Sequence, residues 1–239
     1  MSNSYFQFKQ FTIQQDDCAM KVGTDGVLLG AWCPVEDTYN VLDIGTGTGL
    51  IALMTAQRGA KKVDAVELVE TAAQQAKENV ANSPWSNKIM VFAEDIRHFA
   101  TQTTESYNII VCNPPYFIHS LKNPSQDRTL ARHADTLPFN ELLTAVKKLL
   151  KPNGRFCLIL PYEESKILLA EAQKQQFFQV HSAVVNTTES STKKRRVLLT
   201  LALELSNDEP TAEEQFIQTS LGEYSDWFKQ LTKSFYLNF

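Results

Sequence analysis

The chain has 239 residues, 43% of them hydrophobic and 21% charged, with a net charge of −4. These values predict one sizeable globular domain and exclude a disordered chain. No apolar run reaches the length of a membrane span and the N-terminus lacks the pattern of a signal peptide, so we expect neither a membrane protein nor a secreted one. The four cysteines are widely spaced without a Cys-x-x-Cys pair, which predicts reduced thiols in a cytoplasmic protein and no metal site.

Strands and helices alternate along the sequence. Strands are predicted over residues 40–44, 62–67, 88–93, 107–112, 154–160, 177–186 and 196–205. Helices are predicted over residues 49–58, 69–82, 139–150 and 163–175. This order predicts an α/β, Rossmann-like fold, with a seven-stranded, mainly parallel sheet, helices on both faces, and the last two strands as an antiparallel hairpin at one edge.

We expect a single domain over residues 1–239, made of three parts. Residues 1–36 form an N-terminal segment, residues 37–206 form the core, and residues 207–239 form an acidic helical extension. Residues 211–238 are expected to be an amphipathic helix that docks apolar side chains on the body.

A glycine-rich turn follows the first predicted strand. Gly45, Gly47 and Gly49 alternate with threonines, and Asp43 precedes them. Strand, glycine turn and helix open a nucleotide-binding α/β domain, because glycine lets a ligand approach the backbone. The third glycine comes one residue earlier than in the dinucleotide fingerprint. Asp43 would repel a pyrophosphate but could accept a hydrogen bond from an ammonium group, although a dinucleotide site or a purely structural loop remains an alternative.

The next two strands also end in carboxylates. Glu67 lies eighteen residues after Gly49, where a carboxylate can accept both hydroxyls of a ribose. Asp95 follows the third strand and is placed to accept from an adenine amino group, with Ile96 available to pack on the ring. A charge at a helix start for Glu67 and a helix cap for Asp95 are the structural alternatives.

The fourth strand leads into Asn113-Pro114-Pro115-Tyr116, at the strand end where open α/β sheets bind ligands. The prolines fix the backbone and remove two N–H donors, so the turn presents acceptors. With the Asn113 side-chain oxygen and the flat Tyr116 ring, it suits a planar substrate that carries an NH₂ group. The preceding Cys112 is interpreted as a core residue and not as a nucleophile.

Residues 117–137 show no periodicity, which is typical of a functional loop or of disorder, and their position favours a substrate-contacting lid. Two basic clusters flank the predicted reaction centre, and local clusters of this kind bind phosphates whatever the global charge. The net charge of −4 lies entirely after residue 207, where six acids face two lysines. The candidate substrate- and RNA-binding residues are Pro115, Phe117, Lys122, Arg128, Arg132, His133, Lys193, Lys194, Arg195 and Arg196. Solvated basic loops, and salt bridges from Arg132 and His133 to nearby aspartates, are the alternatives.

Taken in this order, the glycine loop, Glu67, Asp95 and the Asn-Pro-Pro-Tyr turn resemble those of class I S-adenosylmethionine-dependent methyltransferases that act on an exocyclic or amide nitrogen. The opening Phe8–Phe11 and the stretch Lys21–Trp32 are similar to those of the bacterial tRNA (adenine-N6) methyltransferases, which modify the adenosine beside the anticodon of a valine tRNA. The resemblance covers about residues 5–205.

The resemblance implies S-adenosyl-L-methionine as cofactor and a tRNA anticodon loop as substrate, with no obligate protein partner. It implies a cofactor site of Asp43, Gly45, Gly47, Gly49, Glu67, Leu68, Asp95, Ile96 and Asn113. Lys21 and Thr24 of the N-terminal segment would cover the methionine end, and Asn113, Pro114 and Tyr116 would be catalytic. Methyl transfer to ribosomal RNA (guanine N2 or adenine N6), to DNA adenine or to a protein glutamine is the alternative within enzymes, and a passive binding module is the alternative outside them.

Overall fold

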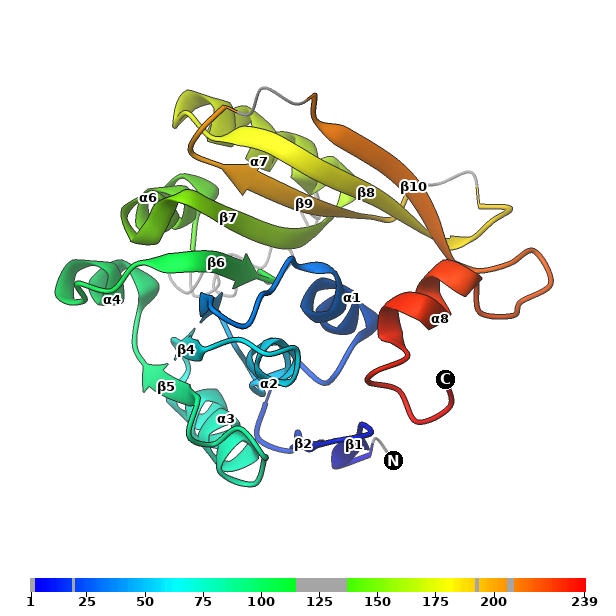
Figure 1. Cartoon of the computed structure of the whole chain (residues 1–239), viewed down its shortest axis with the longest axis horizontal. Helices are drawn as coiled ribbons and strands as arrows, with labels where there is room; N and C mark the ends of the chain where they lie inside the picture. Colours follow the sequence, from blue (N-terminus) through cyan, green and yellow to red (C-terminus); the bar gives the residue numbers. More distant parts are fainter. Residues whose placement is uncertain (1–2, 19, 115–136, 192–193, 206–208) are drawn as a thin grey trace, which may run out of the picture.

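The computed structural model describes residues 3–18, 20–114, 137–191, 194–205 and 209–239, and its centre is an eight-stranded sheet with the order β10-β8-β9-β7-β6-β3-β4-β5 (Figure 1). The strands of this sheet are β3 (Asn40–Ile44), β4 (Lys62–Glu67), β5 (Ile89–Ala93), β6 (Tyr107–Cys112), β7 (Leu150–Pro161), β8 (Phe178–Thr188), β9 (Arg196–Ala202) and β10 (Thr211–Gln218). The helices are α1 (Thr24–Trp32), α2 (Leu50–Gln57), α3 (Glu70–Ala81), α4 (Ile96–Gln102), α6 (Phe139–Leu149), α7 (Tyr162–Lys174) and α8 (Asp226–Thr232).

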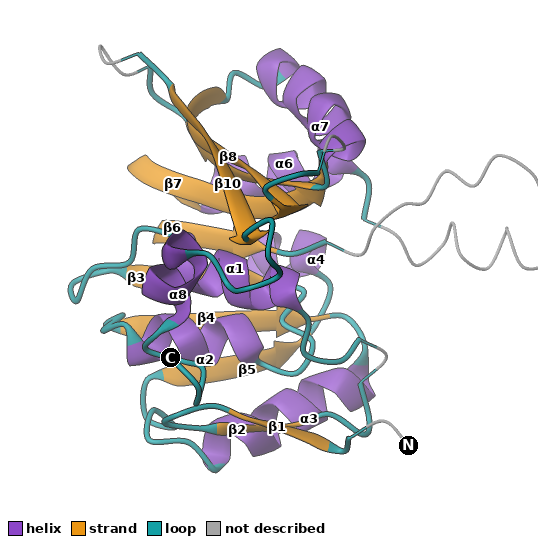
Figure 2. Cartoon of the chain, turned by 90° about the vertical axis from the view of Figure 1, so that its right-hand side faces the viewer, coloured by secondary structure: helices purple, strands orange, loops and turns teal. Residues whose placement is uncertain are grey.

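The α/β prediction is confirmed. Strands β5, β4, β3, β6 and β7 are mutually parallel, β9 is antiparallel to both of its neighbours, and β10 is parallel to β8. Figure 2 shows the strands of the sheet stacked from β8 and β10 near the top down to β5, with α3 and the β1–β2 pair below. The central parallel strands contain runs of buried apolar residues, such as residues 109–112 in β6 and 156–160 in β7, as expected for strands covered on both faces.

The edge of the sheet differs from the prediction. Strands β8 and β9 are an antiparallel pair, as expected, but β9 lies between β7 and β8, and β10 occupies the edge. The predicted helix over residues 211–238 is wrong for residues 211–218, which form β10, and helix occurs only in α8. Pairing with the main chain of β8 supplies hydrogen bonds that a local periodicity cannot reveal, and such tertiary pairing overrides intrinsic preference.

Apolar side chains alternate between the two faces of the sheet and form two cores. Val41 of β3 belongs to the core beneath α1, α2 and α8, whereas its neighbour Leu42 belongs to the core beneath α4, α6 and α7. Figure 1 shows α1, α2 and α8 on one side of the sheet and α4 and α6 on the other. All residues of α2 from Leu50 to Ala56 are buried, because this helix packs against α1 as well as the sheet.

The two ends of the chain pack on each other beside the α2 face. A short hairpin of β1 (Tyr5–Gln7) and β2 (Thr12–Gln14), which the sequence reading missed along with α1 and α4, stacks Phe8 on Phe11 with ring centroids 4.7 Å apart. The Lys9 N–H donates to the Phe235 carbonyl at 2.8 Å. No helix of the described residues is long and apolar enough to cross a membrane.

Truncation of an aromatic side chain in α8 tests whether the C-terminal segment is part of the fold. Phe228 is 2% exposed in the core beneath α1, so Phe228→Ala is expected to lower the free energy of unfolding by about 3–5 kcal/mol, measured by urea denaturation. The control Leu221→Ala, at a side chain 87% exposed, should change it by less than about 0.5 kcal/mol. Equal stability of both variants would show that α8 does not contribute to the core.

Candidate active site

Two adjoining cavities lie at the carboxyl ends of β3, β4 and β6. The first has a volume of about 410 Å³, and its walls include Gly45, Glu67, Leu68, Asp95, Ile96 and Pro114. The second has a volume of about 370 Å³, and its walls include Lys21, Thr24, Asp25, Thr46, Thr48 and Arg196. Met20, Gly45, Gly47 and Asn113 border both cavities. The structure therefore brings together the glycine loop, both acids and the asparagine, at the edge of the sheet where open α/β folds bind ligands.

The glycine loop is held in a left-handed conformation. Gly45, Gly47 and Gly49 have φ angles of 70°, 56° and 84°, which side chains with a Cβ rarely adopt. The Gly45 N–H donates to the carbonyl of Val66 at 2.8 Å, which ties the loop to β4. A Cβ on Gly45 would meet no atom within 4 Å and would project into open space, so glycine at this position leaves room for a ligand.

Asp43 lies beneath the loop and is fully buried. Its Oδ2 accepts from the Thr46 hydroxyl at 2.6 Å and from the Ala52 N–H at 3.1 Å, while its Oδ1 is buried without a hydrogen-bond partner among the described residues. Burial raises the pKa of this carboxyl to about 7. Asp43 thus fastens the loop to the first turn of α2. It is not among the residues that line either cavity, and its contact with an ammonium group stays a prediction.

Glu67 at the end of β4 faces the first cavity and is 9% exposed. Its Oε2 accepts from the Gly47 N–H at 2.9 Å and its Oε1 accepts from the Val69 N–H at 3.0 Å. These bonds fix the carboxylate, and each oxygen keeps acceptor capacity for a further donor. Two neighbouring acceptors of this kind suit a pair of vicinal hydroxyls.

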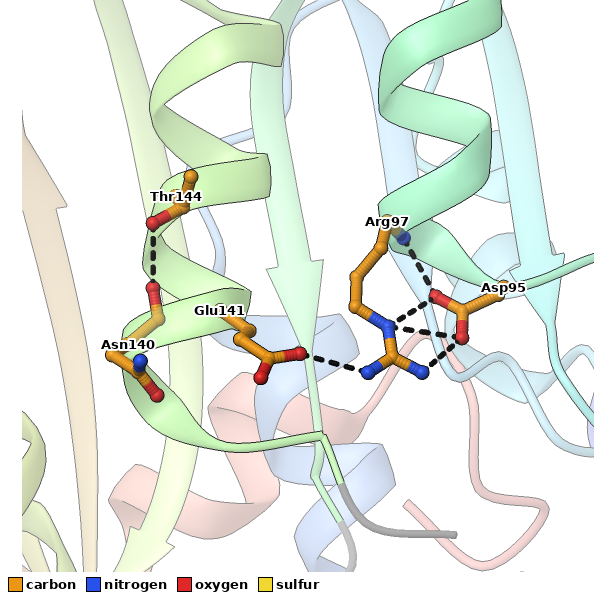
Figure 3. Close-up of polar contacts among 5 residues, drawn as sticks. All are labelled: Asp95, Arg97, Asn140, Glu141 and Thr144. Atoms are coloured by element: carbon orange, nitrogen blue, oxygen red, sulfur yellow. Dashed lines mark hydrogen bonds and ion pairs between the residues drawn. The ribbon is translucent and has the colours of Figure 1, made fainter. Parts of the chain in front are cut away.

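Asp95 is both a helix cap and part of the cavity wall. Its Oδ1 accepts from the Arg97 N–H at 2.8 Å at the start of α4, so the structural alternative for this residue is confirmed (Figure 3). The Arg97 guanidinium also binds the carboxylate, with Nε 2.9 Å from Oδ1, and reaches Glu141 Oε2 of α6 at 2.8 Å. Arg97 holds the pKa of Asp95 below its usual range. The ionised carboxylate accepts hydrogen bonds and cannot donate them, and Ile96, 5% exposed, supplies an apolar wall beside it.

Asn113 and Pro114 follow β6, with Asn113 half-buried at the boundary of the two cavities. Helix α1 approaches this point closely. A Cβ on Gly26 would lie 4.0 Å from Asn113 Nδ2 and 3.1 Å from Leu50 Cδ2, so only a glycine fits without displacement. Cys112 is 3% exposed, which confirms it as a core residue, and burial raises the pKa of its thiol.

Some predicted residues lie outside the described part of the chain. These are Pro115, Tyr116, Phe117, Lys122, Arg128, Arg132, His133 and Lys193. Of the other basic candidates, Lys194 and Arg195 are exposed, whereas Arg196 donates from Nε to Asp25 Oδ2 at 2.7 Å at the second cavity.

Sequence reasoning missed four residues at or near the site: Met20, Asp25, Arg97 and Glu141. Only Arg97 had a local signal, since it lies two residues after a candidate helix cap. No group of His, Cys, Asp or Glu within the described ranges could hold a metal ion.

Comparison with known proteins gives the family of this site. The methyltransferase small domain matches residues 21–189. A tRNA1(Val) (adenine(37)-N6)-methyltransferase of Bacteroides fragilis is 45% identical over 238 residues, covering 99% of both chains. The protein with that description in Serratia proteamaculans is 45% identical over 97% of this chain and 89% of its own. The chain belongs to this methyltransferase family.

Solved structures agree with the fold. A protein described as a predicted O-methyltransferase from Agrobacterium tumefaciens superposes with a TM-score of 0.65 at 16% identity, covering 88% of this chain and 96% of its own. A glycopeptide N-methyltransferase complexed with S-adenosylmethionine gives 0.55 at 14% identity, over 77% of this chain and 100% of its own. This methyltransferase uses S-adenosyl-L-methionine, and the paired cavities and the open space at Gly45 fit an elongated cofactor of this type.

The buried Asp43 predicts an unusual pH dependence of stability. An aspartate with a pKa near 3.8 when unfolded and about 7 when folded binds more protons in the folded state between these values. Its contribution to the free energy of unfolding therefore falls as the pH rises through this window and stays low above it. Asp43→Asn, which keeps an acceptor for Ala52, should remove this slope from urea-unfolding measurements across the window. Parallel pH profiles of wild type and variant would contradict the raised pKa.

Proposed function

We propose that this methyltransferase transfers a methyl group from S-adenosylmethionine to the exocyclic N6 of adenosine 37, in the anticodon loop of a valine tRNA. The observation that carries the proposal is the position of Asn113 between the two cavities, at the end of β6, in a chain 45% identical to enzymes with that activity. Lys21 and Thr24 line the second cavity, which supports a role for the N-terminal segment of residues 1–36 in covering the cofactor.

The cofactor site follows from the polarity of the walls. The first cavity takes the adenosine part, with Glu67 accepting from the ribose hydroxyls and the ionised Asp95 accepting from the adenine amino group. Ile96 and Leu68 supply apolar contact with the ring and sugar. The methionine part would lie toward the second cavity. Its ammonium group would be accepted by Asp43, whose Oδ1 has no hydrogen-bond partner among the described residues, although this carboxylate lies beneath the glycine loop and not in the cavity wall.

The reaction requires placement and electrostatics from the protein. Bound S-adenosylmethionine supplies an electrophilic methyl group. The exocyclic amine of adenine is a poor nucleophile because its lone pair is delocalised into the ring. The Asn113 side-chain oxygen and the Pro114 carbonyl accept its two N–H groups, favour a pyramidal nitrogen and stabilise the positive charge that develops on it. Tyr116 stacks on the base, worth roughly 1–3 kcal/mol. No strong base is needed, because the product ammonium loses its proton to water.

The tRNA loop lowers the energetic cost of bringing the base to Asn113. An adenosine in a loop leaves its stack more easily than one in a duplex, so it can enter a pocket at the sheet edge. Basic side chains beside the cavities bind the surrounding phosphates. Lys194 and Arg195 are exposed and therefore accessible to phosphates.

A transfer assay tests the proposed function. Full-length protein with methyl-labelled cofactor and valine tRNA from cells lacking the gene should yield N6-methyladenosine at position 37, mapped by nucleoside mass spectrometry. Asn113→Ala should abolish transfer while binding of S-adenosylhomocysteine, measured by calorimetry, survives. Asn153→Ala, at an exposed asparagine, should retain both activities. Retained methyl transfer in Asn113→Ala would contradict the proposed mechanism. Absence of cofactor binding by the wild type would favour a passive binding module.

The adenine contact of Asp95 has a separate test. S-inosylhomocysteine replaces the adenine amino group with a carbonyl oxygen, which an ionised carboxylate repels. The wild type should prefer S-adenosylhomocysteine, and Asp95→Asn should reduce this preference on the order of tenfold, because an amide can also donate. Asp226→Asn, at an exposed aspartate on α8, should leave it unchanged. An undiminished preference in Asp95→Asn would assign adenine recognition elsewhere.

A further inference from the structure

Two lysine ammonium groups gather over one aromatic ring at the start of α7. Lys166 Nζ lies 4.5 Å from the centroid of the Tyr162 ring, and Lys194 Nζ lies 5.0 Å from it. Both distances are within the range in which a ring attracts a cation. The ring thereby draws together two like charges, one from α7 and one from the chain that leads into β9, which would otherwise repel each other.

This group lies beside the active site. Strands β6 and β7 are parallel neighbours with Cys112 opposite Leu158, so the residues that follow both strands lie at the same edge of the sheet. Asn113 and Pro114 follow β6, and Tyr162 follows β7. The Tyr162 N–H donates to the Arg195 carbonyl at 3.3 Å. The next residue, Arg196, lines the second cavity and pairs with Asp25, so the two lysines lie close to the cavity mouth without belonging to its wall.

The positive charge of the group is only partly neutralised. Lys166 forms an ion pair with Glu163 at 2.9 Å, but both side chains are largely exposed, at 54% and 77%, and such pairs are weak and screened by salt. Glu164 also lies in the first turn of α7. Lys194 makes no ion pair with any residue that the structure describes, and the adjacent Arg195 is exposed. The two ammonium groups are therefore available to bind anions.

We propose that Tyr162, Lys166 and Lys194 form a phosphate-binding locus that holds the backbone of the RNA substrate beside the active site. This inference rests on the proposed function and adds α7 to the RNA-binding surface. Phosphate contacts fix the register and orientation of a nucleic acid without reading its sequence. The locus therefore determines where the tRNA lies relative to Asn113 and takes no part in the chemical step.

The salt dependence of tRNA binding tests the locus, because each phosphate contact releases counterions on binding. With full-length protein and in vitro transcribed valine tRNA, Lys166→Gln and Lys194→Gln should each reduce the slope of log affinity against log salt by about 0.7–0.9. The KM for tRNA should rise several-fold in both variants while kcat stays unchanged. Lys174→Gln is the matched control, since this lysine lies on the same helix and forms a similar exposed ion pair with Glu171.

The ring itself is tested at Tyr162. Tyr162→Phe keeps the aromatic face and should bind tRNA like the wild type, whereas Tyr162→Leu should lower the salt slope because the two ammonium groups are no longer held together. Thermal unfolding of all variants checks the fold. A ring that only stabilises α7 would lower the melting temperature in Tyr162→Leu without changing the slope, and this result would overturn the proposal.

The remaining outcomes separate the locus from the proposed function. If the wild type methylates tRNA but the slopes of Lys166→Gln and Lys194→Gln equal that of Lys174→Gln, the locus alone is overturned. If the wild type transfers no methyl group to tRNA, the proposed function fails and the RNA locus fails with it.

Discussion

The buried carboxylate of Asp43 joins the end of β3 to the glycine loop and to the first turn of α2. Its hydrogen bonds from Thr46 and Ala52 set the course of the chain between the strand and the helix, and the glycines follow that course only because they tolerate positive φ. The second carboxylate oxygen has no hydrogen-bond partner among the residues that the structure describes, a state that costs about 1–3 kcal/mol in the interior. Helix α2, which Asp43 holds at its first turn, is buried from Leu50 to Ala56 between α1 and the sheet.

The loop in turn fixes Glu67. Glu67 accepts from the Gly47 N–H, so the position of its carboxylate depends on the loop that Asp43 holds. The position of Asp95 is fixed by Arg97, whose guanidinium also contacts Glu141. These contacts connect α4 to α6 on the opposite face of the sheet. The three carboxylates consequently have different characters: Asp43 has a raised pKa, Asp95 has a lowered pKa, and Glu67 is held by backbone donors. A ligand with an ammonium group, a diol and an aromatic amine matches this set.

Particular elements explain which parts of the sequence reading were correct. Strands β3 to β7 were predicted because each contains a short run rich in apolar and β-branched residues, which is a local signal. Helices α3, α6 and α7 have a polar face, and their periodicity is visible in the sequence. Strand β10 was mistaken for helix because its partner, β8, lies some thirty residues away and leaves no local signal. Helix α1 was missed as a helix, since its residues from Gly26 to Ala31 are all buried and have no amphipathic pattern.

The sequence by itself determined the fold class and the order of the site motifs, because strand burial, glycine spacing and the residues after each strand are local properties of the chain. It also placed Glu67, Asp95 and Asn113 at strand ends, which parallel strands must bring to one edge. Only the tertiary structure decided that Asp43 lies beneath the loop, that Arg196 pairs with Asp25, and that Arg97 fixes Asp95. These pairings join segments up to about 170 residues apart or depend on side-chain geometry, and neither leaves a trace in local sequence patterns.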